Sequence, residues 1–351
     1  MTPLAHLRGV LPTVSPAALS TATLLALAGL STAANAQLFS EPALQALYSA
    51  ERLPELEATA LKRLATRVDD GQAVLALAMA GLVSNDAAKR EAAILQAQAC
   101  VQQAPQVAEC HYALGTVLGI HAMSQGLTKM ASSVGAVKTA LLEALRLKPA
   151  WYPARSAVVE FYLAAPGLLG GSHRKAVDTA RAATKPEQVQ ALQARVALED
   201  ERFDAALAEL YAVPTGAGSD PALTEDVQQW VQSAGFALLA KDQPAKALTV
   251  FERLQRERPG HAVGWYGAGR VQQTLGAMPD AVRLYEHGAK LKGAAAFGFD
   301  YRLGLALQAA GQPEAARTAL TRFVAAGKGP TKALDDARKR LQQLGAGGAP
   351  S

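Results

Sequence analysis

Aromatic residues are scarce in this sequence, at 5% of the chain, whereas alanine occurs throughout and half of the residues are hydrophobic. Sheet cores are usually packed with β-branched and aromatic side chains, while alanine favours helices that approach each other closely. With 351 residues, the chain is long enough to bury a large core. The composition therefore predicts an all-α protein.

Patterns that carry catalysis or bind metal are lacking as well. None of the six histidines is followed by another at the i, i+3 or i, i+4 spacing that places two imidazoles on one helical face. The glycine-rich residues 167–172 have no lysine at the spacing of a phosphate-binding loop, and no G-x-S-x-G motif occurs. We therefore expect no catalytic site, no metal and no cofactor, so the protein is not expected to be an enzyme.

Long hydrophobic runs are missing beyond the N-terminal region, so stable membrane insertion is not expected. Residues 1–36 carry one basic residue, Arg8, no acidic residue, an apolar run over 17–30 and small residues at positions 34 and 36. This order is typical of a secretory signal peptide, and we expect cleavage before Gln37 and export to the periplasm. The alternative is an uncleaved anchor, which needs roughly 20 apolar residues without interruption.

Charge of one sign does not dominate either. Removing Arg8 from the 35 basic side chains leaves 34, against 30 acidic ones, and the formal net charge falls from +5 to +4. Proteins that bind nucleic acid usually concentrate basic residues into a patch or stripe. We therefore expect a protein or peptide partner and no nucleic acid.

Cysteine is limited to Cys100 and Cys110, which lie five residues on either side of Pro105. If Pro105 marks the turn between two antiparallel helices, the two side chains lie roughly opposite each other and a disulfide can form in an oxidising compartment. Two small buried core residues are the other interpretation. The spacing excludes a C-x-x-C redox or zinc motif.

A repeat of 34 residues organises the second half of the chain. When the sequence is shifted back by 34 residues, Gly269 aligns with Gly235 and Tyr285 aligns with Phe251. A third copy is offset by one extra residue and carries Gly304. This interval is typical of helix-turn-helix repeats. Because a glycine inside a helix costs about 1 kcal/mol relative to alanine, its recurrence at one phase predicts that the two helices of each pair approach closely.

The first half carries weaker copies of the same unit. Gly81 and Gly115 are 34 residues apart, and two connections, at 120–135 and 164–172, are predicted to be enlarged turns. A small-residue stretch at 216–219 is the expected hinge between two flexing lobes. The predicted divisions are a signal peptide (1–36), N-terminal capping helices (37–73), an N-terminal lobe with enlarged turns (74–214), a linker (215–227), a C-terminal lobe (228–329), and a capping helix with a disordered tail (330–351).

The best-formed unit resembles the tetratricopeptide repeat. The residues that carry the resemblance are Trp265, Ala268, Gly269, Gly276, Ala281 and Tyr285, with Pro259 closing the previous unit. The resemblance covers about residues 74–329 in about seven copies, and the enlarged turns look like a subgroup of exported bacterial repeat proteins. It implies a right-handed superhelix of helix pairs, an α-solenoid, in which the first helices line a concave face.

Binding in that concave groove is the function that the resemblance implies. If the repeat register holds, the groove-facing positions of the first helices are Tyr112, Arg195, Tyr266, Arg270 and Tyr301. The other interpretation is that these tyrosines pack against the next helix and these arginines are solvated. Aromatic and arginine side chains are frequent anchors of protein interfaces, and an arginine can hold a peptide carboxylate with two hydrogen bonds. We therefore expect an exported scaffold or adaptor for cell-envelope assembly or transport. The alternative is a solute-binding accessory protein that uses the enlarged N-terminal turns.

Overall fold

The computed structural model describes residues 38–83, 86–215 and 219–346. The predicted signal peptide, the centre of the predicted hinge and the C-terminal tail at 347–351 lie outside the described residues. Within them, the chain is α-helical with two short 3-10 turns and no strand, as the composition predicts.

Helices follow one another in pairs joined by short turns. In chain order they are α2 (Pro42–Ser49), α3 (Leu53–Leu64), α4 (Gly71–Val83), α5 (Ala87–Gln103), α6 (Ala108–Ser124), α7 (Leu127–Leu147), α8 (Tyr152–Ala164), η2 (Gly167–Leu169), α9 (His173–Arg181), α10 (Pro186–Glu199), α11 (Phe203–Ala212), α12 (Pro221–Ala240), α13 (Pro244–Glu257), α14 (Ala262–Thr274), α15 (Met278–Gly288), η3 (Ala294–Ala296), α16 (Phe299–Ala309), α17 (Pro313–Ala326) and α18 (Thr331–Ala346).

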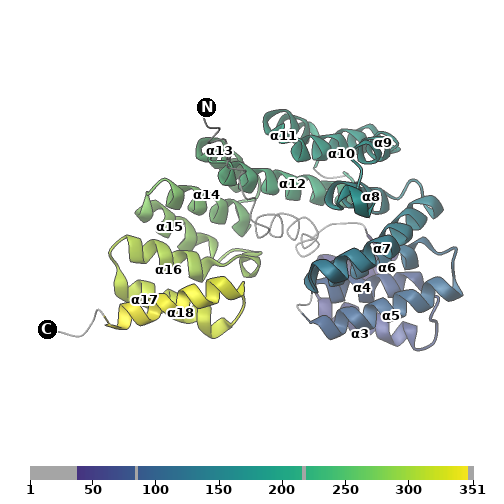
Figure 1. Ribbon diagram of the computed structural model, residues 1–351, viewed down its shortest axis with the longest axis horizontal. Coiled ribbons are helices and arrows are strands. Elements are labelled where there is room, and N and C mark those ends of the chain that lie inside the picture. Colours follow the sequence, from purple (N-terminus) through teal and green to yellow (C-terminus); the bar gives the residue numbers. More distant parts are fainter. Residues whose placement is uncertain (1–37, 84–85, 216–218, 347–351) are drawn as a thin grey trace, which may run out of the picture.

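The pairs stack into an arch (Figure 1), with α3–α7 in one leg and α15–α18 in the other. In the C-terminal half, the first helices of successive pairs contact each other, α12 with α14 and α14 with α16, while the second helices make no comparable contact. The first helices therefore lie on the inner, more tightly curved side of the array.

Local sequence signals set where the helices begin. Eight of them have a proline in the first two positions, where no backbone N–H is needed. The side chain of Asp220 accepts from Ala222 N and Leu223 N at the start of α12. Ser172 accepts from Lys175 N at the start of α9, as expected of a serine at an N-cap position.

The repeated glycines lie where the second helix of a pair presses a large side chain against the first. A Cβ atom on Gly269 would lie 2.5 Å from Tyr285 Cε1, and one on Gly304 would lie 2.6 Å from Leu320 Cγ. Both distances are too short for a real contact. The close approach predicted from sequence is confirmed, and it is a ring or a branched side chain that occupies the space.

The predicted enlarged turn at 120–135 is wrong. Residues 108–124 and 127–147 are helical, so the extra residues lengthen α6 and α7 and leave only Gln125 and Gly126 between them. No proline occurs between Pro105 and Pro149 to stop either helix earlier. The chain reverses at Gly126, whose φ of 93° is one that glycine adopts without steric cost. The second connection, at 165–172, is a loop that includes η2.

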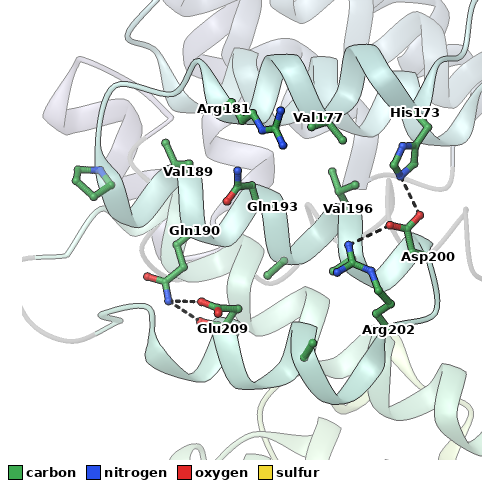
Figure 2. Close-up of a pocket in the computed structure, with 14 residues that line it drawn as sticks. His173, Val177, Arg181, Val189, Gln190, Gln193, Val196, Asp200, Arg202 and Glu209 are labelled. Carbon is green, nitrogen blue, oxygen red and sulfur yellow. Dashed lines mark hydrogen bonds and ion pairs between the residues drawn. The ribbon is translucent and has the colours of Figure 1, made fainter.

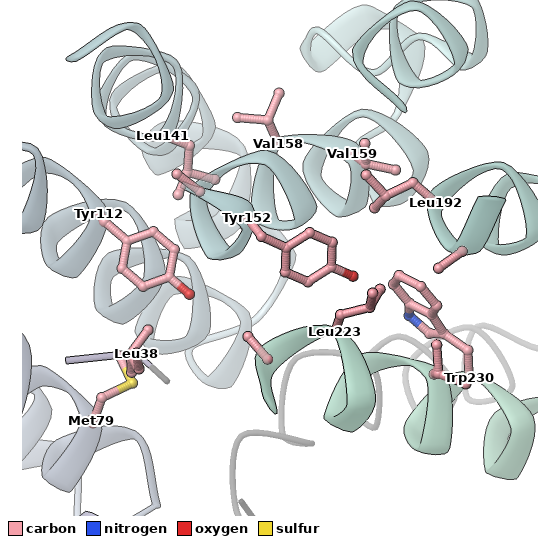
Figure 3. Packing of buried hydrophobic residues seen from close by; sticks show 14 of the residues in the cluster. Leu38, Met79, Tyr112, Leu141, Tyr152, Val158, Val159, Leu192, Leu223 and Trp230 are labelled. Carbon is pink, nitrogen blue, oxygen red and sulfur yellow. The ribbon is translucent and has the colours of Figure 1, made fainter. Parts of the chain in front are cut away.

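The predicted linker is too long, because α12 begins at Pro221 and not at residue 228. One hydrophobic core extends past it, from Leu38 to Val271. Figure 3 shows Tyr152 and Trp230 within this core, with Leu223 between them. Smaller clusters hold α15–α17 together and attach α18. The division into two flexing lobes remains a prediction, and the core itself has no break at the division.

Candidate binding surfaces

Two of the five predicted groove residues are largely buried and engaged within the fold. Tyr112 is 4% exposed, and its ring lies 4.8 Å from that of Trp151. The guanidinium of Arg195 holds Glu160 with Nε–Oε1 and Nη2–Oε2 distances of 2.7 and 2.9 Å. Both side chains of this pair are 12% exposed. Neither Tyr112 nor Arg195 presents a free group to a ligand.

The Arg195–Glu160 pair is part of a ladder across neighbouring first helices. Trp230 Nε1 donates to Glu160 Oε1 over 3.0 Å, so the carboxylate on α8 joins α10 and α12. An ion pair with bidentate geometry and an added donor leaves few lone pairs unsatisfied, which is the condition under which a buried pair is tolerated. The ladder positions the inner helices of three consecutive units.

A second polar contact passes directly from α8 to α12. Asp226 accepts from Tyr152 Oη at 2.8 Å and from Ser156 Oγ at 2.5 Å. Burial raises the pKa of Asp226 to about 7, although the two hydroxyl donors oppose this shift. The first helices α8 and α12 therefore meet directly, although α10 and α11 lie between them in the sequence.

The other three predicted groove residues lie on α14 and α16, and each is partly exposed. Tyr301 donates to Asp336 Oδ2 over 2.9 Å and packs on Phe323, so its hydroxyl anchors α18. Arg270 forms no ion pair with any carboxylate of the described chain. Tyr266 stacks on Phe297 at a centroid distance of 4.8 Å and an interplanar angle of 29°.

Sequence reasoning missed Arg302 and Phe297, which belong to the same face. Arg302 is partly exposed and, like Arg270, has no carboxylate partner among the residues that the structure describes. Both arginines act on the buried hydroxyl of Tyr285, where each opposes the rise in pKa that burial causes. Phe297 lies in the connection before α16, outside the repeat pattern, so register alone did not reveal it.

Cys100 and Cys110 are joined as a disulfide, with their sulfur atoms 2.03 Å apart. They lie on α5 and α6, on either side of the turn at Pro105, where both residues are fully buried. The bond therefore fastens the second helix of one unit to the first helix of the next.

A groove of about 690 Å³ lies over α10 between α9 and α11 (Figure 2). Its charged residues are largely paired with one another. His173 Nε2 and Arg202 Nη2 lie 2.8 and 3.1 Å from the carboxylate of Asp200, and Gln190 donates to Glu209. The groove therefore offers a polar rim with few free anchoring groups.

A smaller cavity of about 110 Å³ lies where the lengthened helices α6 and α7 meet α8 and η2. It coincides with the region that the solute-binding alternative invokes. In the part of the chain described, no group of three or more potential ligand side chains is placed to hold a metal ion. No helix there combines the length and hydropathy needed to cross a membrane.

No family model matches the chain, and no curated protein sequence matches it. Several solved structures match it in fold. Yeast Tom70 gives a TM-score of 0.57 at 12% identity, over 99% of this chain and 67% of that chain. A tetratricopeptide repeat protein from Parabacteroides merdae ATCC 43184 gives a TM-score of 0.46 at 10% identity, and the match covers 74% of this chain and 94% of that chain. The APC/C hetero-tetramer Cut9-Hcn1 gives 0.45 at 14% identity over 86% of this chain, which spans 54% of that chain.

The likeness to Tom70 and the paired helices at intervals near 34 residues identify the fold as the superhelix of tetratricopeptide repeats. The fold predicted from sequence is confirmed. An array of this architecture has an extended concave surface.

Proposed function

We propose that this protein is an exported scaffold that holds a segment of a partner protein on the inner face of α14 and α16. The observation that carries the proposal is the pair Arg270 and Arg302, two partly exposed guanidinium groups without carboxylate partners in the described chain. A guanidinium is always charged and presents a planar fork that fits a carboxylate. The segment is therefore expected to carry acidic side chains or a free C-terminus.

Aromatic rings provide the apolar part of the same surface. The ring of Tyr266 stacks on that of Phe297, and its centroid lies 6.2 Å from the ring centroid of Phe236. All three side chains are partly exposed. Rigid aromatic side chains bury much area at little entropic cost, which makes them frequent hot spots of interfaces. An acidic segment with an apolar residue beside its carboxylate would meet both features.

Export and a role in cell-envelope assembly or transport belong to the same proposal. They are supported by the signal-peptide pattern of residues 1–36 and by a disulfide, which is stable in oxidising compartments. N-terminal sequencing of the mature protein from a periplasmic extract tests this part. A mature chain that begins at Gln37 supports export, and a chain that retains Met1 in the cytosolic fraction contradicts it.

The binding proposal is tested by crosslinking in the envelope fraction, followed by synthesis of the crosslinked segment as a labelled peptide. Its affinity is then measured by fluorescence polarisation. Arg270→Gln and Arg302→Gln should each weaken binding about tenfold, because a charge-assisted hydrogen bond is lost in each variant. Arg256→Gln, an exposed arginine on α13, is the matched control and should bind normally. Equal affinities for all three variants would contradict the proposed face.

A further inference from the structure

The small cavity between α6, α7, α8 and η2 has walls that offer no free polar side chain. Two polar residues line it, Thr116 and Glu160. The Thr116 hydroxyl donates within its own helix, to Tyr112 O at 2.8 Å. Glu160 is held by the ladder with Arg195 and Trp230. A water molecule needs two to four polar partners, so this cavity holds water poorly and favours an apolar occupant.

The apolar lining comes from the residues by which this unit departs from the repeat. Met123 and Met130 belong to the extensions of α6 and α7, and Leu169 belongs to η2. Methionine side chains adapt their shape to different apolar ligands. The cavity of about 110 Å³ is somewhat smaller than an apolar cavity of about 150 Å³ that accepts benzene. It therefore has room for an aliphatic chain of about four or five carbons.

A lysine side chain lies beside this cavity. Lys138 lies one turn after Val134 on α7, next to the stripe that lines the wall. The Nζ atom of Lys138 lies close to Gly170, because a Cβ atom added to Gly170 would be 3.2 Å from Nζ. Gly170 directly follows the lining residue Leu169. No carboxylate in the described chain forms an ion pair with Lys138. Residues 127–142 of α7 contain no acidic side chain, and Lys129 and Lys138 are the charged residues of this stretch.

We propose that this cavity is a binding site for a small aliphatic carboxylate, whose chain enters the cavity and whose carboxylate meets Lys138. The site is separate from the inner face of α14 and α16 and does not depend on the function proposed for that face. An apolar chain gains free energy by leaving water, and the carboxylate keeps its contact with solvent and with the ammonium group.

Binding of the straight-chain carboxylates from butanoate to octanoate to the full mature chain, measured by ligand-observed NMR titration, tests the proposal. Affinity should increase about fourfold with each added methylene until the cavity is full, and then level off. The matching alcohols should bind about three- to fivefold more weakly, because an exposed ion pair contributes little more than that. Absence of binding, or affinity that is independent of chain length, would overturn the proposal.

Three variants locate the site. Lys138→Gln should remove the difference between carboxylate and alcohol, whereas Lys129→Gln, on another face of the same helix, should keep it. Ala157→Leu places a larger side chain on the cavity wall and should weaken every ligand at least tenfold while circular dichroism stays unchanged. Equal effects of the two lysine variants would overturn the proposal. So would loss of binding in Arg270→Gln, since that residue belongs to the other surface.

Discussion

Gly269 illustrates at the scale of one residue how the repeat is packed. The ring of Tyr285, which is 0% exposed, fills the space where a side chain on Gly269 would stand. The Tyr285 hydroxyl also donates to Gln273 Oε1 at 2.9 Å, so the ring is held at both ends. A glycine inside a helix is disfavoured, and here the packing of one aromatic ring outweighs that preference.

Gly269→Ala is therefore expected to destabilise the protein. An added Cβ only 2.5 Å from the ring places the overpacking cost in the upper part of its usual range, at about 2–3 kcal/mol. The better helix propensity of alanine returns about 1 kcal/mol, so the net loss should be about 1–2 kcal/mol in urea unfolding. Gly260→Ala is the control, because no heavy atom lies within 4 Å of its added Cβ. A stability of Gly269→Ala equal to that of the control would show that the ring of Tyr285 can move aside.

His261 makes stability depend on pH. It caps α14 by accepting from Val263 N, and it is 7% exposed. Burial, with Arg258 and Lys292 nearby, lowers the pKa of His261 from 6.5 to about 4. Because the folded pKa lies below the unfolded one, the contribution to stability is complete above about pH 6.5 and is lost as pH falls towards 4.

His261→Asn keeps a capping acceptor and removes the titration. Between pH 7.5 and 4.5, the wild type should lose about 2–3 kcal/mol more than this variant in urea unfolding, which follows from the size of the pKa shift. Other titrating groups affect both proteins alike and cancel in the difference. Parallel pH profiles would refute the assignment.

At the scale of helices, the disulfide between α5 and α6 fixes the border between two units. The cysteines are separated by 10 residues, and closing a loop of this size restricts the unfolded chain. Replacing both cysteines by serine should lower the free energy of unfolding by about 2–3 kcal/mol. Wild-type protein unfolded with a reductant should show a similar loss, and a reductant should have no effect on the variant. A wild type that is insensitive to reductant would contradict this prediction.

At the scale of the whole molecule, the repeat array is not a simple chain of nearest neighbours. The carboxylate of Asp226 on α12 accepts from Tyr152 and Ser156 on α8, and the two helices share one core. An ion pair of 3.2 Å between Lys292 and Glu51 also links the connection after α15 with the turn after α2. Exposed pairs of this kind contribute about 1 kcal/mol or less, so cooperativity must come mainly from the core.

Hydrogen exchange in rising urea concentrations tests this cooperativity. The amides of α8 and α12 should share one opening free energy and one dependence on urea, because they belong to one core. Helix α18, which packs in a small separate cluster, should open at lower urea and serves as the internal reference. Separate openings of α8 and α12 would instead favour two flexing lobes divided near residues 216–219.

The sequence by itself determined the class of fold and the unit from which it is built. Helical periodicity, the interval of 34 residues and the glycines at equivalent positions of successive repeats are local or regularly repeated signals, so they can be recognised without a structure. Capping by Ser172 could be predicted for the same reason, since an N-cap depends on a few adjacent residues.

Only the tertiary structure decided which side chains remain free. Arg195 fits a groove position as well as Arg270 does, and the difference is Glu160, 35 residues away, which engages one and not the other. Likewise, residues 120–135 were predicted to form an enlarged turn, whereas they extend α6 and α7 and help to form a cavity against α8. The position of a residue within the repeat predicts which face of the helix its side chain lies on. The contacts that satisfy or expose it come from neighbouring units and are therefore not encoded locally.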